Sequence, residues 1–386
     1  MGKQIKIAIM MRAMDQDSGF RAYVEGLMDA MLRIDEDNYY LLLYQTSKWF
    51  GRFSQFKNVK EVLLKAPHKF IWDQVAVPYR AWREGADVIF NPKFSVPLFS
   101  HCPVTMGLQE PAVWVEPEYY ERFDVIYQRT MLPLYCRKAK HFFPMAKFIL
   151  EENRKYLGLP FENATLTYPA PQDHLTPIDN PEVLDQFRTK YQLPEKFILA
   201  VTRVDHPGLD KSISFYPGKN PQTTLSAFML CRKSIPHSLV IAGRRVRDYF
   251  LYIGFSEADF ERVHFVNFVP FEELAILYSL AELFVHPPFY EGFGFALLGA
   301  MACGCPAVVS KTGTCPEVVA DTAFLADPHD PADVANKILL ILNNDAIRQE
   351  LKKKAMKRAA TFTWEKAARL TLKGLTRVVS KSKWNF

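Results

Sequence analysis

Short apolar runs alternate with longer amphipathic stretches along the whole sequence of 386 residues. Such runs are typical of buried parallel strands, and stretches with apolar residues three and four positions apart are typical of helices. The alternation predicts the α/β class, in which helices cover parallel sheets. Predicted strands form a first group at 5–10, 39–44, 59–64, 87–90, 104–106, 140–143 and 165–167, and a second group at 197–202, 238–242, 264–266, 283–286, 307–310 and 323–325.

A proline-rich segment separates the two groups of strands. It contains Pro169, Pro171, Pro177 and Pro181, and clustered prolines are typical of loops and linkers. We therefore predict a linker here between two similar α/β halves. A basic helical region follows the second half, with Pro331 near its start and predicted breaks near residues 343 and 361.

The composition excludes several classes of protein. With 49% hydrophobic and 23% charged residues, the chain is globular rather than disordered. No run approaches the roughly 18 apolar residues of a membrane span, so any membrane contact is expected to be peripheral. The net charge of +6 fits anionic small molecules or an anionic membrane surface, and it is too diluted to indicate nucleic acid. The basic run at 352–358 is interpreted as a solvated helix face or a contact with anionic lipid.

The six cysteines have neither the density of a disulfide scaffold nor the paired spacing of a zinc site. Reduced thiols, as in a cytosol, fit best. Cys303, Cys305 and Cys315 form the only local cluster, and we interpret it as structural rather than metal-binding.

The most informative segment covers residues 286–306 and reads HPPFYEGFGFALLGAMACGCP. A predicted strand ends at two prolines, a loop with Gly292 and Gly294 follows, and a predicted helix comes next. Glycines allow a close approach of the backbone to a ligand, and a helix N-terminus attracts anions. The segment predicts a phosphate-facing site, although a plain tight turn would also need these glycines. Four residues separate Gly294 from Gly299, which excludes the dinucleotide fingerprint.

A second pattern consists of two cations. Arg203 follows the predicted strand at 197–202, and Lys219 precedes a predicted helix. Fixed cations beside a helix N-terminus can stabilise a leaving diphosphate, although an Arg and a Lys at this spacing, taken alone, are more often solvated surface. His286 lies on an apolar strand and is interpreted as a core or loop histidine.

The segment at 286–306 resembles the donor site of glycosyltransferase family 4, part of the glycosyl transferases group 1, which are retaining enzymes of the GT-B fold. The match includes Glu291, Gly292, Phe293 and Gly294, and extends through 300–306, 313–318, Phe362 and Trp364. The resemblance implies two Rossmann-like domains facing each other across a cleft. An acceptor-side domain would cover 1–175, a nucleotide-sugar domain would cover 176–364, and a helix at 365–386 would pack back on the first.

The resemblance also implies roles for individual residues. Glu291 would orient the donor sugar, and Arg203 and Lys219 would hold its diphosphate in place of a metal ion, so neither a metal nor another cofactor is expected. The implied donor-binding set is Gly19, Arg203, Lys219, Glu291, Gly292, Phe293, Gly294, Phe295, Ala296 and Leu297.

The implied reaction transfers a sugar from a UDP-, GDP- or ADP-sugar to a saccharide or lipid-linked acceptor, with retention of anomeric configuration. Relatives of this kind act in polysaccharide biosynthesis. The expected location is the cytoplasm, including the inner face of the membrane, and no nucleic acid partner is expected.

Two positions depart from the family pattern. The second Glu of the pattern falls at position 299, which is Gly, and this leaves open weaker donor binding, another partner for the ribose, or loss of activity. The usual His after the strand at 104–106 is absent; Gln109 and Glu110 are the nearest candidates, and Glu110 could equally be a surface residue. Two alternatives follow, namely a weak or inactive homologue acting as a sugar-nucleotide sensor or partner subunit, and a different enzyme such as an epimerase or a phosphorylase.

Overall fold

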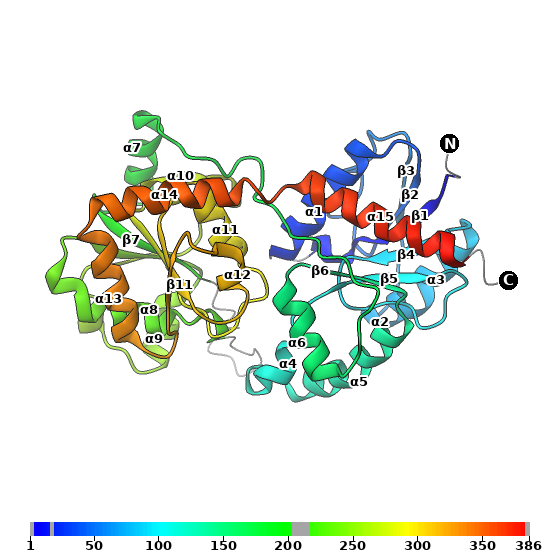
Figure 1. Ribbon diagram of the computed structural model, residues 1–386, viewed down its shortest axis with the longest axis horizontal. Helices are drawn as coiled ribbons and strands as arrows, with labels where there is room; N and C mark the ends of the chain where they lie inside the picture. Colours follow the sequence, from blue (N-terminus) through cyan, green and yellow to red (C-terminus); the bar gives the residue numbers. More distant parts are fainter. Residues whose placement is uncertain (1–3, 16–18, 203–216, 383–386) are drawn as a thin grey trace. The chain divides into compact units, whose positions relative to one another are not determined.

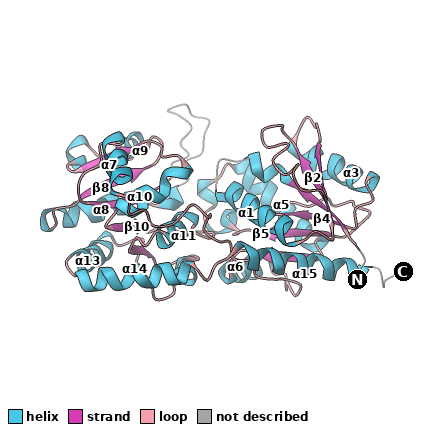
Figure 2. Cartoon of the chain, turned by 90° about the horizontal axis from the view of Figure 1, so that it is seen from above, coloured by secondary structure: helices cyan, strands magenta, loops and turns pink. Residues whose placement is uncertain are grey.

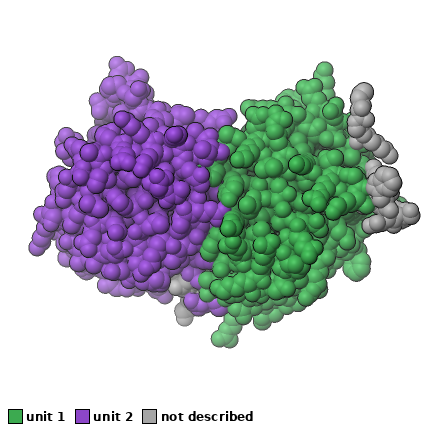
Figure 3. Space-filling view, in the orientation of Figure 1, with its two compact units in different colours: residues 1–115, 122–170, 362–386 green, residues 116–121, 171–361 purple. Residues whose placement is uncertain are grey.

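The computed structural model of the protein describes residues 4–15, 19–202 and 217–382. The chain forms two compact units (Figure 3). It passes between them at 170–171 and at 361–362, where the sequence predicts boundaries at 175–176 and 364–365, and also at 115–116 and 121–122. Unit 1 contains Met1–Val115, Arg122–Ala170 and Phe362–Phe386, and unit 2 contains Glu116–Glu121 and Pro171–Thr361.

Unit 1 is built on a six-stranded parallel sheet in the order β3-β2-β1-β4-β5-β6. The register pairs Ile7 of β1 with Tyr40 on one side and with Val88 on the other. Most strand residues are buried, as expected for a parallel sheet covered on both faces. The strands are β1 (Lys6–Met10), β2 (Tyr39–Tyr44), β3 (Val59–Leu63), β4 (Val88–Asn91), β5 (Val104–Leu108) and β6 (His141–Pro144).

Helices cover both faces of this sheet (Figure 1). On one face α1 packs against the last helix, α15, and the indole of Trp364 lies so close to Gly26 that a side chain at position 26 would overlap it. The helices of that face are α1 (Gly19–Ile34) and α15 (Trp364–Ser382). The remaining helices of the unit are α2 (Lys69–Ile71), a π-helical turn (Trp72–Ala76), α3 (Val77–Arg83), α4 (Ala112–Val115), α5 (Arg122–Lys138) and α6 (Lys147–Leu157).

Unit 2 contains a second six-stranded parallel sheet, in the order β12-β11-β10-β7-β8-β9. Figure 2 shows that helices enclose the strands of this sheet as they do in unit 1. The strands are β7 (Phe197–Val201), β8 (Ser238–Ala242), β9 (Val263–Val266), β10 (Leu283–His286), β11 (Ala307–Ser310) and β12 (Phe324–Ala326).

The core of unit 2 lies between this sheet and the helices α8, α9 and α13. Phe228 of α8, Phe250 of α9 and Ile338 of α13 are almost fully buried against β8 and β10. These helices are α8 (Pro221–Cys231), α9 (Val246–Tyr252) and α13 (Pro331–Leu342). The other helices of the unit are α7 (Pro181–Lys190), α10 (Leu274–Leu280), α11 (Phe295–Ala302), α12 (Cys315–Val319) and α14 (Asp345–Ala359).

The predicted α/β class with parallel sheets is confirmed, and so are the helix breaks near residues 343 and 361. The predicted strand at 165–167 is wrong. Thr165 and Thr167 donate backbone hydrogen bonds to β6, but only one isolated bridge forms, because the stretch is short and flanked by prolines, which lack an N–H donor. Over the described parts of the chain, we find no helix with the length and apolar character needed to cross a membrane.

Candidate functional site

Three loops meet at the carboxyl edge of the unit 2 sheet, where open α/β sheets bind ligands. They are the turn before α8, the loop after β10 and the loop after β11. The backbone N–H of Phe289 donates to the carbonyl of Gly218 at 2.9 Å, and the Thr312 hydroxyl donates to the carbonyl of Phe289 at 2.9 Å. The loop after β10 is therefore fixed from both sides.

Glu291 lies at the centre of these loops with 7% of its surface exposed. Its Oε2 is 2.6 Å from Lys219 Nζ and 3.0 Å from His286 Nε2. Burial alone would raise the pKa of Glu291, but the charge of Lys219 and the hydrogen bond from His286 hold this pKa well below its usual range. Glu291 is therefore a buried, ionised carboxylate with two basic partners.

The backbone of Glu291 is also held in place. Its carbonyl accepts hydrogen bonds from the Thr314 hydroxyl at 3.0 Å and from the Thr314 N–H at 3.3 Å. Gly313 has a φ of +64°, and a Cβ at this position would lie 3.0 Å from Glu291 N. Only glycine fits this approach without strain.

Asn220 anchors the segment that carries Lys219. It is fully buried, has a φ of +50°, and caps α8 by accepting from the N–H of Thr223 at 3.3 Å. Its Nδ2 donates to the carbonyls of Pro287 and Pro328, both at 2.8 Å. These bonds tie the turn before α8 to the loops after β10 and β12, so Lys219 and Glu291 are positioned by one hydrogen-bonded framework.

The glycine loop ends where α11 begins. Gly294 precedes the helix with a φ of +89°, and the first bond of the helical ladder runs from the N–H of Leu298 to the carbonyl of Gly294 at 2.9 Å. The N–H groups of Phe295, Ala296 and Leu297 therefore have no partner in the ladder of this helix. Phe293 and Leu297 are buried, whereas Gly292, Phe295 and Ala296 are half-buried.

The structure brings together Lys219 and Glu291, which lie 72 positions apart in the sequence. The glycine loop from 292 to 294 and the first turn of α11 follow Glu291 directly in the chain. Arg203, the other predicted cation, lies outside the described residues. Gly19 is the first residue of α1 and belongs to unit 1.

Some residues at the site were not predicted from the sequence. His286 is buried at the end of β10, as expected for a core histidine, but its Nε2 faces the carboxylate of Glu291. Thr312 and Thr314 were not singled out either, whereas Asn220 was noted only as the residue that follows Lys219. The available signal was their position directly after a strand or before a helix, where side chains reach the carboxyl edge of a sheet.

Position 299 is not an open space. A Cβ on Gly299 would lie 3.2 Å from Cε2 of Tyr278 and 3.3 Å from Cδ1 of Leu175. Both side chains are buried, so a glutamate at this position would have to displace the Tyr278 ring or Leu175. The position at which the family pattern has its second Glu is therefore packed against core side chains in this protein.

A polar cluster lies at the carboxyl edge of the unit 1 sheet. Arg12 Nη2, from the turn after β1, is 3.0 Å from Oδ2 of the buried Asp73, and the Ser95 hydroxyl donates to the same oxygen at 2.9 Å. Burial raises the pKa of Asp73, against the opposing charge of Arg12. Burial, together with the charge of Arg12, lowers the pKa of Lys93 to about 8, and Glu110 partly offsets this effect.

This cluster bears on the predicted acceptor side. Glu110, one of the two candidates for the missing His, lies close enough to Lys93 to influence its pKa. Gln109, the other candidate, accepts a hydrogen bond through its backbone carbonyl from Asn153 at 2.7 Å. Arg12 and Lys93 were not predicted, although both directly follow a strand.

The cysteines behave as structural residues in the described parts of the chain. All six are free thiols, and Cys303, Cys305 and Cys315 are buried. Burial raises the pKa of Cys303 to about 12, which keeps it in the unreactive thiol form. The residues that the structure describes contain no group of three or more His, Cys, Asp or Glu side chains placed to hold a metal ion.

Residues 212–358 match the family described as glycosyl transferases group 1. This stretch contains Lys219, Glu291 and the whole of α11. The match covers most of unit 2 and includes no residue of unit 1.

Curated relatives extend the similarity over more of the chain. The chain is 28% identical to O-antigen chain mannosyltransferase B of Escherichia coli over 333 residues, which cover 83% of this chain and 82% of that protein. It is 27% identical to the serotype-specific mannosyltransferase WbdA of Escherichia coli over 64% of this chain but only 30% of the relative. A shorter match at 38% identity, to D-inositol 3-phosphate glycosyltransferase of Corynebacterium diphtheriae, covers 31% of this chain and 29% of that protein.

Solved structures of glycosyltransferases share the fold of this chain. Sucrose-phosphate synthase from Thermosynechococcus elongatus has a TM-score of 0.74 at 19% identity, over 98% of this chain and all of that one. Anabaena Alr3699/HepE in complex with UDP and glucose has a TM-score of 0.71 at 16% identity, over 97% of this chain and 100% of that one. The predicted GT-B fold class is thereby confirmed.

Proposed function

We propose that this protein is a group 1 glycosyltransferase that transfers a mannosyl or related hexosyl residue from a nucleoside-diphosphate sugar to a saccharide or lipid-linked acceptor, with retention of configuration. The observation that carries the proposal is the buried, ionised Glu291, held by Lys219 and His286 beside the N-terminus of α11. Two relatives are named as mannosyltransferases, which supports mannose as the transferred sugar. Supporting the donor class, a structural neighbour is described in complex with UDP and glucose.

In this proposal, the donor diphosphate binds at Lys219 and at the N–H groups that begin α11. Negative charge grows on the diphosphate as the sugar leaves, and a fixed cation and a helix N-terminus stabilise that charge without reorganising. Lys219 then exchanges its partner Glu291 for the phosphate, and Glu291 accepts hydrogen bonds from the hydroxyls of the sugar. His286 keeps Glu291 oriented and ionised during this exchange. Arg203 is proposed as a second cation for the diphosphate.

The acceptor is proposed to bind in unit 1, at Arg12, Lys93 and Glu110, with the buried Asp73 holding Arg12 in place. These side chains include both cations and an anion, which can bind the hydroxyls and the anionic groups of a glycan. No protein side chain is assigned as general base, since a leaving phosphate oxygen can take the proton of the acceptor hydroxyl. Polysaccharide synthesis at the inner face of a membrane, with a peripheral contact, fits this proposal.

The test is a panel of UDP-, GDP- and ADP-sugars that includes GDP-mannose. Binding of one donor at 100 times its Kd is expected to stabilise the protein by about 2.7 kcal/mol, visible as a raised Tm together with slow donor hydrolysis. The anomeric configuration of the product, measured by NMR, tests retention. Stabilisation by none of the donors would refute the proposal.

Two variants separate the site from the rest of unit 2. Lys219→Met is expected to abolish stabilisation by the donor. Lys190→Met, which breaks an exposed ion pair of similar length with Glu273 (2.7 Å), is expected to leave it unchanged. Donor binding without turnover would favour the inactive sensor, and consumption of inorganic phosphate or epimerisation would favour the second alternative.

A further inference from the structure

A row of large apolar side chains is exposed along one side of the helical stretch from 69 to 83 in unit 1. Ile71, Val75, Tyr79 and Trp82 are between 41% and 59% exposed, and their spacing of three or four residues places them on one side of the stretch. The opposite side of the same stretch is buried in the unit. Single exposed apolar residues are common on soluble proteins, but a continuous row marks an interaction surface.

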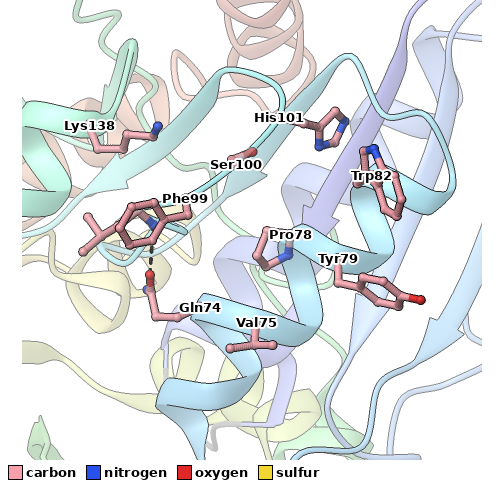
Figure 4. Close-up of a pocket in the computed structure, with 10 residues that line it drawn as sticks. Gln74, Val75, Pro78, Tyr79, Trp82, Phe99, Ser100, His101 and Lys138 are labelled. Carbon is pink, nitrogen blue, oxygen red and sulfur yellow. Dashed lines mark hydrogen bonds between the residues drawn. The ribbon is translucent and has the colours of Figure 1, made fainter.

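The row continues onto neighbouring elements. The side chain of Gln74 accepts from the N–H of Leu98 at 2.9 Å and donates to the carbonyl of Val96 at 3.0 Å, and this holds the adjacent loop, with its 85% exposed Phe99, beside the helix. Figure 4 shows the resulting hollow, of about 550 Å³, with Phe99 and Lys138 on one side and Tyr79 and Trp82 on the other.

Helix α5 adds a second set of exposed apolar residues. Phe123 and Ile126 are 73% and 66% exposed. Lys69 Nζ lies 5.8 Å from the centre of the Tyr127 ring, which places the start of α2 next to α5. We call the surface formed by 69–83, 97–101 and 122–138 the apolar face.

The apolar face also carries most of the net charge of the protein. Its two helical segments, 69–83 and 122–138, contain seven Lys and Arg against two Asp, a net charge of +5, whereas the whole chain carries +6. One of the two acids, Asp73, is buried against Arg12 and does not reach the surface. Arg80 pairs with Glu84, one residue beyond the first segment, so the charge around the apolar side chains is positive but smaller than +5.

Trp and Tyr prefer the interface of a lipid bilayer, exposed aliphatic and aromatic side chains insert into it, and Lys and Arg are attracted to anionic headgroups. We infer that the apolar face docks on the surface of an anionic phospholipid bilayer. A second copy bound through the same face would bring two positively charged surfaces together, and a neutral saccharide would draw nothing from the cations.

The other basic region, α14, is less suited to this role. Arg358 donates to the carbonyls of Glu317 and Val318, and Lys354 pairs with Glu350. Part of its positive charge thus serves contacts within unit 2. The inference deepens the membrane contact of the proposed function by naming the surface that makes it, and it can be tested without measuring sugar transfer.

The test is flotation of the purified full chain with vesicles of phosphatidylglycerol and phosphatidylethanolamine, compared with vesicles of phosphatidylcholine alone. Binding is expected to the anionic vesicles and to fall with salt. The variant Trp82→Ser/Phe99→Ser/Ile126→Ser is expected to lose at least about tenfold in partition coefficient. A matched variant in unit 2, Leu230→Ser/Phe268→Ser/Leu340→Ser, also removes three exposed apolar side chains and is expected to bind as the parent does.

A second pair of variants tests the charges. Arg122→Gln/Arg137→Gln/Lys138→Gln is expected to lower the partition coefficient on anionic vesicles by roughly 100-fold. Lys353→Gln/Lys357→Gln/Lys366→Gln removes the same charge from the exposed sides of α14 and α15 and is expected to have a much smaller effect.

Three results would overturn the inference. The first is a loss of partition coefficient in the matched control variants equal to that in the variants of the apolar face. The second is a dimer, detected by light scattering, that dissociates when the apolar face is altered. The third is quenching of Trp82 fluorescence by a neutral mannan but not by vesicles. Donor hydrolysis in solution is expected to be unchanged in all four variants. Failure of vesicle binding is therefore distinguishable from failure of the proposed enzymatic function.

Discussion

Replacing Lys219 with Met would leave the buried carboxylate of Glu291 with His286 as its remaining basic partner. Removing one member of a buried ion pair typically costs about 3–5 kcal/mol. Because the Lys219 side chain is 31% exposed, solvent screening reduces this cost, and we expect about 2 kcal/mol. For a unit of this size, that loss corresponds to a fall in Tm of about 4–8 °C.

A double-mutant cycle isolates the interaction between the two residues. Glu291→Gln is expected to cost about 1–2 kcal/mol, because Gln retains hydrogen-bonding atoms but leaves Lys219 unpaired. The double variant is expected to lose at least 1 kcal/mol less than the sum of the single variants. The assay is thermal unfolding at pH 7 and low salt without nucleotide, with Lys190→Met/Glu273→Gln as the exposed control pair. Additivity within about 0.5 kcal/mol would refute the coupling.

The pH dependence gives the same prediction an independent check. The pKa of Glu291 is lower in the folded protein than the value of about 4.3 expected in the unfolded chain. Its stabilisation is therefore fully present above the unfolded pKa and is lost as the pH falls towards the folded pKa. The difference in Tm between the parent and Glu291→Gln is expected to be constant from pH 7 to about 5 and to shrink below about 4. A difference that grows on acidification would contradict the assignment.

Three further predictions concern other parts of the two units. Gly299→Glu is expected to lower stability by about 1–3 kcal/mol through overpacking, without tightening nucleotide binding; a lower nucleotide Kd, measured by calorimetry, would contradict this. Asn220→Ala is expected to lower the free energy of unfolding in urea by about 2–3 kcal/mol, because it removes a helix cap and two hydrogen bonds to the carbonyls of Pro287 and Pro328. Asn344→Ala removes only a helix cap and is expected to cost about 1 kcal/mol. Equal losses would argue against a stabilising role for the two hydrogen bonds. Because the pKa of Lys93 is lowered to about 8, its charge is lost as the pH rises through 8. The acceptor KM of the parent is therefore expected to rise above pH 8, and that of Lys93→Met is expected to be raised at every pH. An unchanged acceptor KM in the variant would show that Lys93 is not part of the acceptor site.

The sequence predicts the fold of this protein well because the relevant signal is local. Apolar runs of four to six residues bounded by turns identify β1 and β10, and the proline-rich segment marks the region where the chain leaves unit 1. The stretch at 165–167 has the same local pattern but lies at a sheet edge without a full ladder. Local pattern alone does not distinguish these cases, because the difference lies in the pairing partner.

The candidate site is predictable only in part, for a related reason. Lys219 and Glu291 stand out through their motifs, but the burial of His286 says nothing about which atom its ring faces. The environment of Gly299 depends on Tyr278 from α10 and on Leu175, which reach it only in the folded unit. Contacts of this kind are set by tertiary packing, which no spacing rule describes.

The contact of Trp364 with Gly26 has a consequence for biosynthesis. Unit 1 begins with the first strand of the chain, yet the face of its sheet that carries α1 is completed by the last helix. Domains made of one continuous segment usually fold in the order in which they leave the ribosome. Here the continuous part of unit 2 from Pro171 to Thr361 is available before α15, so the second unit can finish folding first. The nascent N-terminal half must then wait, with α1 uncovered, until α15 has been synthesised.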